Sequence, residues 1–399
     1  SPHDRNSMSP ISRSPAALAF GGLLALAAAM GIGRFVYTPI LPFMTDGLQL
    51  PPDDAGLIAS ANFLGYLAGA LAGASRSLPG NPRLWFLGGL LASALTSAAM
   101  ALTTSLSLFL LIRFASGVAS AFALVFSTSL ILERLTAAGR GGLSALHFAG
   151  VGCGIAFSAV LVALLAHLGA DWRGLWLASG AATLCFLLVA AFLVPSEPSP
   201  QPVTAPAQNS PDETPASPFG SASRIRLILA YGLFGFGYVI TATFVNTIAR
   251  ANPALQSTEA FVWLTVGLCA APSIYVWNRI AARMGTRKGF ALACVLEAAG
   301  VALTAVSTAP GLFLFGAALL GATFMGITAL GLMEARREVS RDGPAAIRQM
   351  LAVLTASFGV GQMAGPWVAG QMHHLTGSFT ASSLAAAAAL VVAAALVVR

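Results

Sequence analysis

The sequence predicts an all-α membrane protein with twelve transmembrane helices in two six-helix bundles. Of its 399 residues, 57% are hydrophobic and only 9% are charged, whereas a soluble domain carries about 25% charged residues. The apolar residues form long runs separated by short polar loops. One longer segment, residues 195–223, is rich in proline and serine and is typical of a polar linker. This linker divides the predicted helices six and six.

Each apolar run is long enough to span a membrane. About 20 apolar residues in a helix cross the hydrocarbon core of a bilayer. The predicted spans are Ala16–Tyr37, Ala55–Ala74, Leu84–Leu102, Leu106–Leu132, Leu143–Leu168, Gly174–Val194, Ile225–Ala249, Ala260–Ile280, Gly289–Ser307, Gly311–Met333, Arg348–Met372 and Phe379–Val398. The chain is therefore expected to divide into a tail (1–15), an N-terminal bundle (16–194), the linker (195–223) and a C-terminal bundle (224–399).

The basic residues predict the orientation. If both termini face the cytoplasm, the outer loops hold only Arg173 and Arg250, and nearly all other loop arginines and Lys288 lie inside. This asymmetry follows the positive-inside rule and predicts a multi-pass protein of the bacterial inner membrane with both termini cytoplasmic. The basic inner loops also explain the net charge of +7, so this charge does not indicate a nucleic-acid partner. Residues 1–7 precede Met8 and are typical of a cloning remnant, and no cleavable signal peptide is expected.

The first span contains the strongest signal of a site, in the stretch GIGRFVYTPILP from Gly31 to Pro42. Its arginine, Arg34, would cost about 2.5 to 3.5 kcal/mol at the centre of a membrane helix on insertion scales. A chain retains such a residue where it faces protein or a water-filled cavity. Tyr37 and Thr38 follow three and four residues later on the same helical face. We therefore expect Arg34 and Tyr37 to bind substrate, the alternative being an arginine that reaches the headgroups.

Two further spans of the first half carry polar groups. In the second, Asn62 and Tyr66 lie four residues apart on one face, where they either line a cavity or bond a neighbouring helix. In the fourth, Arg113 shares a face with Ser116 and Ser120, which makes it a second buried arginine among small polar groups. We expect Asn62, Tyr66 and Arg113 to contribute to the substrate site.

The seventh span has an aromatic stripe that includes Tyr238, with Thr241 on the same face. The glycine pattern of the first span recurs here at Gly235 and Gly237, and the Gly-Val-Gly of the fifth span recurs in the eleventh. Matched features in two halves are expected of a transporter built from repeats. We therefore expect Tyr238 and Thr241 to line the cavity, although such stripes are equally often packing.

Two residues are candidates for proton coupling. His147 lies about one turn inside the fifth span, and histidine can change its charge near neutral pH. The alternative is a histidine bonded to a nearby carbonyl or loop. Glu297, in the ninth span, is the only acid deep inside a predicted span.

No catalytic motif and no nucleotide-binding motif occurs in the sequence. The four cysteines lie in apolar spans without metal-ligand spacing. We therefore expect neither an enzyme nor an ATP-driven pump, and no metal or other cofactor.

The chain resembles the major facilitator superfamily. The fourth span matches its arginine motif at Arg113 and Gly117, and the loop NRIAARMGTRKG after the eighth span is similar to its gating-loop signature. The matching positions of this loop are Arg283, Gly285, Arg287 and Lys288, with Ala282 in place of the usual aspartate. The stretches GIGRFVYTPILPFM and FGVGQMAGPWVAG resemble, more narrowly, the YbfB/YjiJ-type branch.

The resemblance implies a secondary transporter whose first, fourth, seventh and tenth helices surround a central cavity. Arg34 and Arg113 would face one another there, and an anion would relieve their repulsion by bidentate binding. We therefore expect proton symport of a small organic anion, with His147 preferred over Glu297 as the proton site because the ninth helix is peripheral in this fold. The alternative is a proton-coupled exporter of amphipathic drugs or metabolites. The expected partners are substrate, protons and membrane lipid, and the expected state is a monomer.

Overall fold

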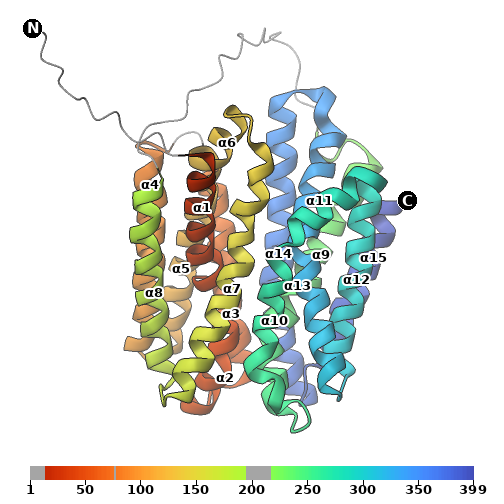
Figure 1. Cartoon of the computed structure of the whole chain (residues 1–399). Helices are drawn as coiled ribbons and strands as arrows, with labels where there is room; N and C mark the ends of the chain where they lie inside the picture. The colour runs from red at the N-terminus through yellow and green to blue at the C-terminus, as the bar shows by residue number, and fades with distance from the viewer. Residues whose placement is uncertain (1–13, 76–77, 195–216) are drawn as a thin grey trace, which may run out of the picture.

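The structure is a computed structural model that describes residues 14–75, 78–194 and 217–399. The expected cloning remnant and most of the expected linker lie outside these residues. The described chain forms helices and short connections without a strand. Two bundles stand side by side, the N-terminal one built from α1 to α8 and the C-terminal one from α9 to α15 (Figure 1).

The N-terminal bundle begins with a long broken span. This span runs through α1, a π-helical segment η1 (Ala27–Ile32) and a turn into α2, and it ends at Leu48 rather than near Tyr37 as predicted. The prediction was wrong here because Pro39 and Pro42 do not end the helix. Pro39 lies in the first turn of α2, where a missing N–H costs little. The α-helices of this bundle are α1 (Pro15–Leu26), α2 (Tyr37–Leu48), α3 (Pro52–Gly73), α4 (Pro82–Ala99), α5 (Leu106–Ser127), α6 (Glu133–Ala137), α7 (Ser144–His167) and α8 (Trp172–Leu193).

The C-terminal bundle contains one bent span. α10 and α11 meet at an angle of 45° around Pro272, and together they form the predicted eighth span. A proline here removes a helical hydrogen bond and explains the bend. The helices are α9 (Ala222–Ala251), η5 (Gln256–Thr258), α10 (Glu259–Ala270), α11 (Ser273–Met284), α12 (Thr286–Val306), α13 (Pro310–Val339), α14 (Pro344–Thr376) and α15 (Thr380–Val398).

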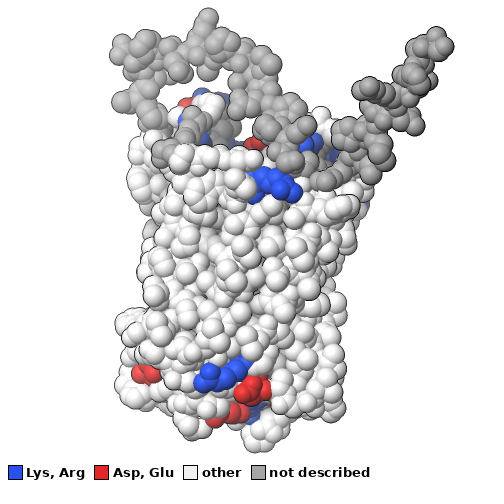
Figure 2. Space-filling view, turned by 90° about the vertical axis from the view of Figure 1, so that its left-hand side faces the viewer, with Lys and Arg blue, Asp and Glu red and all other residues white. Residues whose placement is uncertain are grey.

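The helix lengths fit a membrane. Among the described residues, eleven helices are long and apolar enough to cross a bilayer, or twelve spans if the bent pair counts as one. Figure 2 shows charged side chains at the two ends of the molecule and a broad uncharged belt between them on the face it presents. We call the end where α1 and α9 begin the inner end, as the charge asymmetry predicts, and the opposite end the outer end.

The two bundles meet mainly through three helix pairs, α2 with α9, α3 with α14, and α7 with α10, and α7 also contacts α11. The α7–α10 contact brings backbones together, since a Cβ added at Gly152 would lie 2.3 Å from the backbone nitrogen of Ala271. Glycine is required where helices approach so closely. This arrangement places the broken first span at the centre of the molecule, where it contacts both bundles.

Candidate functional site

The break in the first span is held by donors from α5. Arg113 Nη1 donates to the carbonyl oxygen of Gly33 (3.1 Å), and its Nη2 donates to that of Arg34 (3.3 Å). The hydroxyl of Ser116 also donates to the Gly33 carbonyl (3.3 Å). An irregular turn leaves carbonyls without helical partners, and in a membrane these must find donors within the protein. Arg113 is 1% exposed. Its two Nη atoms both donate to backbone oxygens, so its guanidinium is directed mainly at the backbone of the first span.

Arg34 joins the two bundles. Its Nη2 donates to the phenolic oxygen of Tyr238 on α9 (3.2 Å) and to Oε1 of Gln362 on α14. The Tyr238 hydroxyl in turn donates to the same oxygen of Gln362. The guanidinium carbon lies 4.9 Å from the ring centre of Phe63 and 4.4 Å from that of Tyr66, both on α3. A cation thus sits among aromatic faces and neutral polar groups, which stabilise its charge without neutralising it.

A small cavity separates the two arginines. Its volume is about 10 Å³, which is room for about one water molecule. Arg34, Tyr37, Asn62 and Arg113 are among the residues that line it. The Nε atoms of both arginines are buried without a hydrogen-bond partner among the described residues. No carboxylate within the described part of the chain forms an ion pair with either arginine. The site therefore presents two fixed positive charges with donors to spare.

Of the other predicted binding residues, Tyr37 and Asn62 line the cavity, whereas Tyr66 and Thr241 do not. The Tyr37 hydroxyl donates to the carbonyl oxygen of Ala55 (2.8 Å), and the Asn62 amide donates to that of Arg113 (3.0 Å). Tyr66 contacts Arg34 through its ring. Thr241 is fully buried, does not line the cavity, and has no partner for its hydroxyl among the described residues.

Sequence reasoning missed Gln362 as a site residue. This glutamine is fully buried and accepts from both Arg34 and Tyr238. An uncharged polar residue in the middle of an apolar span is the signal that could have identified it, since such residues usually face the protein interior.

The two candidates for proton coupling lie in different surroundings. His147 packs against the inner part of α1, where a Cβ added at Gly22 would lie 2.0 Å from its Nδ1, and it does not line the central cavity. Glu297 is fully buried on α12, and neither of its carboxyl oxygens has a partner among the described residues. Its helix packs against α9, the helix that carries Tyr238.

A family model matches most of the chain. The family model described as "Uncharacterised MFS-type transporter YbfB" matches residues 26–398. The chain belongs to this family of major facilitator transporters. It is a multi-pass membrane transporter, with the two-bundle fold that the sequence predicted.

Solved structures of transporters share the fold. A mutant of the nucleoside transporter NupG is 17% identical, with a TM-score of 0.74 over 96% of this chain and 99% of that one. NupG itself is 16% identical, with a TM-score of 0.68 over 96% and 98%. A bacterial homolog of the human lysosomal transporter Spinster, in an inward-facing and occupied conformation, is 15% identical, with a TM-score of 0.68 over 94% and 95%. No curated protein matches the sequence.

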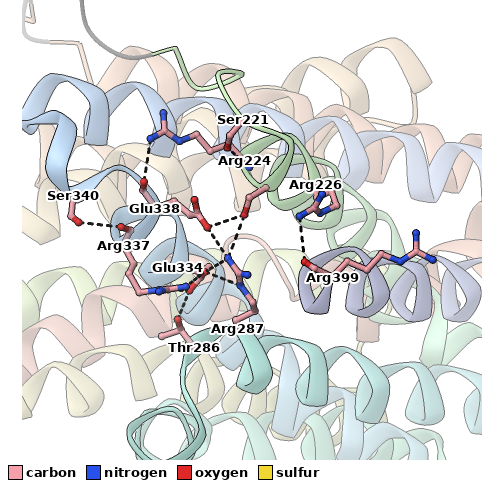
Figure 3. Close-up of polar contacts among 11 residues, drawn as sticks. Ser221, Arg224, Arg226, Thr286, Arg287, Glu334, Arg337, Glu338, Ser340 and Arg399 are labelled. Atoms are coloured by element: carbon pink, nitrogen blue, oxygen red, sulfur yellow. Dashed lines mark hydrogen bonds and ion pairs between the residues drawn. The ribbon is translucent and has the colours of Figure 1, made fainter.

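One residue of the predicted gating loop, Arg287, belongs to an ion-pair cluster at the inner end of the C-terminal bundle (Figure 3). Arg287 contacts Glu334 (3.1 Å) and Glu338 (2.7 Å) on α13, and Arg337 also contacts Glu334 (2.6 Å).

Of the other residues predicted in this loop, Gly285 makes the turn into α12 with φ +88°, a conformation that favours glycine. Arg283 and Lys288 are exposed. The loop thus contributes one charged residue, Arg287, to the cluster.

Proposed function

We propose that the protein moves a small organic anion across the bacterial inner membrane by alternating access, in symport with protons. The observation that carries this proposal is the pair of buried guanidiniums, Arg34 and Arg113, around one cavity and without an ion-paired carboxylate among the described residues. Two like charges in a low-dielectric interior repel one another, and a carboxylate or phosphate between them would remove this cost.

Arg34 is the residue that we assign to substrate recognition. Its Nε has no partner among the described residues, and its Nη2 bonds two neutral groups that an anion can outcompete. Arg113 has a supporting role, because its Nη atoms already hold the backbone on either side of the Arg34 Cα. The cavity of about 10 Å³ is too small for an organic molecule. Substrate binding therefore requires the two bundles to move apart, as expected of a carrier that alternates between two openings.

For proton coupling, we propose Glu297 in place of His147. Glu297 is fully buried without a hydrogen-bond partner among the described residues, on the helix that packs against α9, whereas His147 packs against the inner part of α1. A negative charge on a bound anion raises the cost of ionising a buried acid nearby. Anion binding and protonation of Glu297 therefore favour one another, and symport needs this positive coupling.

Uptake into proteoliposomes tests the anion site. The panel comprises labelled monocarboxylates, dicarboxylates and phosphate esters, with uridine and a cationic amphipathic dye as the neutral and cationic alternatives. We expect saturable uptake of an anion that falls at least tenfold in Arg34→Lys, because lysine keeps the charge but loses the planar fork. Arg279→Lys, at an exposed position on α11, is the matched control and should transport normally. Preferential transport of uridine or the dye, unchanged in Arg34→Lys, would show that the anion proposal is wrong.

The coupling assignment has its own test. In Glu297→Gln we expect counterflow exchange to persist while accumulation driven by a pH gradient disappears. If accumulation instead persists in Glu297→Gln and disappears in His147→Gln, the proton site belongs to α7.

A further inference from the structure

The arginine cavity has aromatic walls as well as guanidiniums. Phe35, Tyr37 and Phe63 line it together with Arg34 and Arg113. The guanidinium carbon of Arg34 lies 5.2 Å from the ring centre of Phe35 and 4.9 Å from that of Phe63. The guanidinium carbon of Arg113 lies 5.7 Å from the ring centre of Tyr37. A group bound to either cation would therefore lie next to an aromatic ring.

Phe35 also makes aromatic contacts across the bundle interface. It lies in the turn of the first span, between η1 and α2, and its ring centre is 6.1 Å from those of Phe324 on α13 and Trp263 on α10. All three rings are buried. Substrate entry requires the bundles to move apart, so it breaks these ring contacts together with the hydrogen bonds that Arg34 makes to the C-terminal bundle. The opened site thus lacks both an acceptor for a guanidinium and a partner for aromatic rings.

The C-terminal bundle adds a stack of three parallel rings. Tyr238 on α9 lies between Phe324 on α13 and Phe358 on α14, with ring centres 5.8 and 5.9 Å away and interplanar angles of 2° and 1°. Aromatic pairs favour separations of about 4.5 to 7 Å. Since the hydroxyl of the central ring accepts a hydrogen bond from Arg34, the stack places aromatic surface directly beside the anion site.

From these contacts we infer that the anion is an aromatic acid, an inference that rests on the function proposed for Arg34. The carboxylate of the acid would replace the acceptors that Arg34 loses when the bundles part. Its ring would lie between Phe35 and Phe324 and replace their contact with one another. An aliphatic acid would supply only the acceptor, and a neutral aromatic molecule would supply only the ring. The site therefore selects for both features in one small molecule.

Benzoate and cyclohexanecarboxylate test this inference on the unmodified protein. They share their charge and their number of carbon atoms, but the saturated ring is more hydrophobic and cannot stack, so a merely apolar pocket would favour it. We expect benzoate to bind the purified full-length protein about fivefold more tightly, which is the value of one aromatic pair. Calorimetry at neutral pH, where both acids are ionised, measures the two affinities without interference from passive diffusion of weak acids across lipid.

Substitutions separate the contribution of the rings from that of the charge. Phe35→Leu and Phe324→Leu should weaken benzoate binding about fivefold and leave cyclohexanecarboxylate binding unchanged. Arg34→Lys should weaken the binding of both acids about tenfold. Phe315→Leu, at an exposed position on α13, is the matched control and should bind both acids like the wild type. Thermal unfolding of each variant shows whether it is folded.

The outcomes distinguish a failure of this inference from a failure of the proposed function. Equal or tighter binding of cyclohexanecarboxylate, still weakened in Arg34→Lys, would overturn the aromatic inference and leave the anion site intact. Benzoate binding that is unchanged in Arg34→Lys would overturn both, because the ring alone would then be recognised. If neither acid binds, the aromatic inference is wrong, and the uptake panel alone then tests the anion proposal.

Discussion

Replacement of Arg113 by lysine should destabilise the fold rather than remove a substrate contact. The guanidinium makes three hydrogen bonds, to the carbonyl oxygens of Gly33 and Arg34 and to the hydroxyl of Ser116. A lysine ammonium replaces about one of these from a single position. Hydrogen bonds inside membrane proteins contribute about 0.6 kcal/mol on average and up to about 1.7. Two lost bonds, together with weaker packing over the Trp176 ring at 5.3 Å, amount to about 2 to 4 kcal/mol.

The assay is thermal unfolding of the purified protein in detergent, with half-lives at fixed temperature wherever unfolding is irreversible. A loss of 2 to 4 kcal/mol lowers the folded-to-unfolded ratio by about 30- to 900-fold. Arg34→Lys is the comparison variant, since Arg34 bonds two side chains and holds no backbone carbonyl. We expect it to keep most of its stability while losing anion uptake. If Arg113→Lys has wild-type stability but cannot transport, Arg113 contacts the substrate directly and our reasoning about the break is wrong.

Three more predictions concern packing and charge. Gly154→Val should prevent stable folding, because a Cβ at this position would lie 2.4 Å from a carbonyl oxygen of the first span. Gly88→Ala is the control: its added Cβ meets open space, so the yield of folded protein should be unchanged. Arg287→Ala should cost only about 1 kcal/mol in thermal stability, because Arg287 is partly exposed and Glu334 keeps its other partners; a much larger loss would mean that Arg287 is essential to the cluster. Tyr238→Phe should raise the KM for the anion about fivefold, the value of one neutral hydrogen bond of about 1 kcal/mol, because the Tyr238 hydroxyl, which donates to Gln362 in this structure, would donate to a bound anion. An unchanged KM would mean that this hydroxyl does not contact the substrate.

The residues of the site were more predictable than their partners. Arg34 and Tyr238 stand out because a polar group in a long apolar run requires an explanation, and both lie at the bundle interface. The bond from Arg34 to Gln362 could not be predicted. It depends on the relative height of α14 and the first span in the folded protein, because that height decides which residue of α14 lies beside Arg34. Arg113 was correctly expected to be buried, but the direction of its guanidinium is set by carbonyls that only the break in the first span makes available.

Helix number followed from hydropathy, but helix continuity did not. The bend at Pro272 divides the eighth span, whereas Pro42 lies inside α2 without ending it. The difference depends on whether neighbouring helices satisfy the backbone groups that a proline frees. The position of Glu297 illustrates the same limit: its helix is peripheral in the fold, yet its side chain is fully buried.

The contact between α7 and α10 has a consequence for experimental work on this transporter. At Gly152 and Gly267 each helix packs directly against the backbone of the other, so few side chains interdigitate between them. A bulky side chain at either glycine would therefore prevent the two bundles from packing together here. Gly152→Trp would therefore keep α7 and α10 apart and provide a conformationally trapped form for crystallisation or for raising state-specific antibodies.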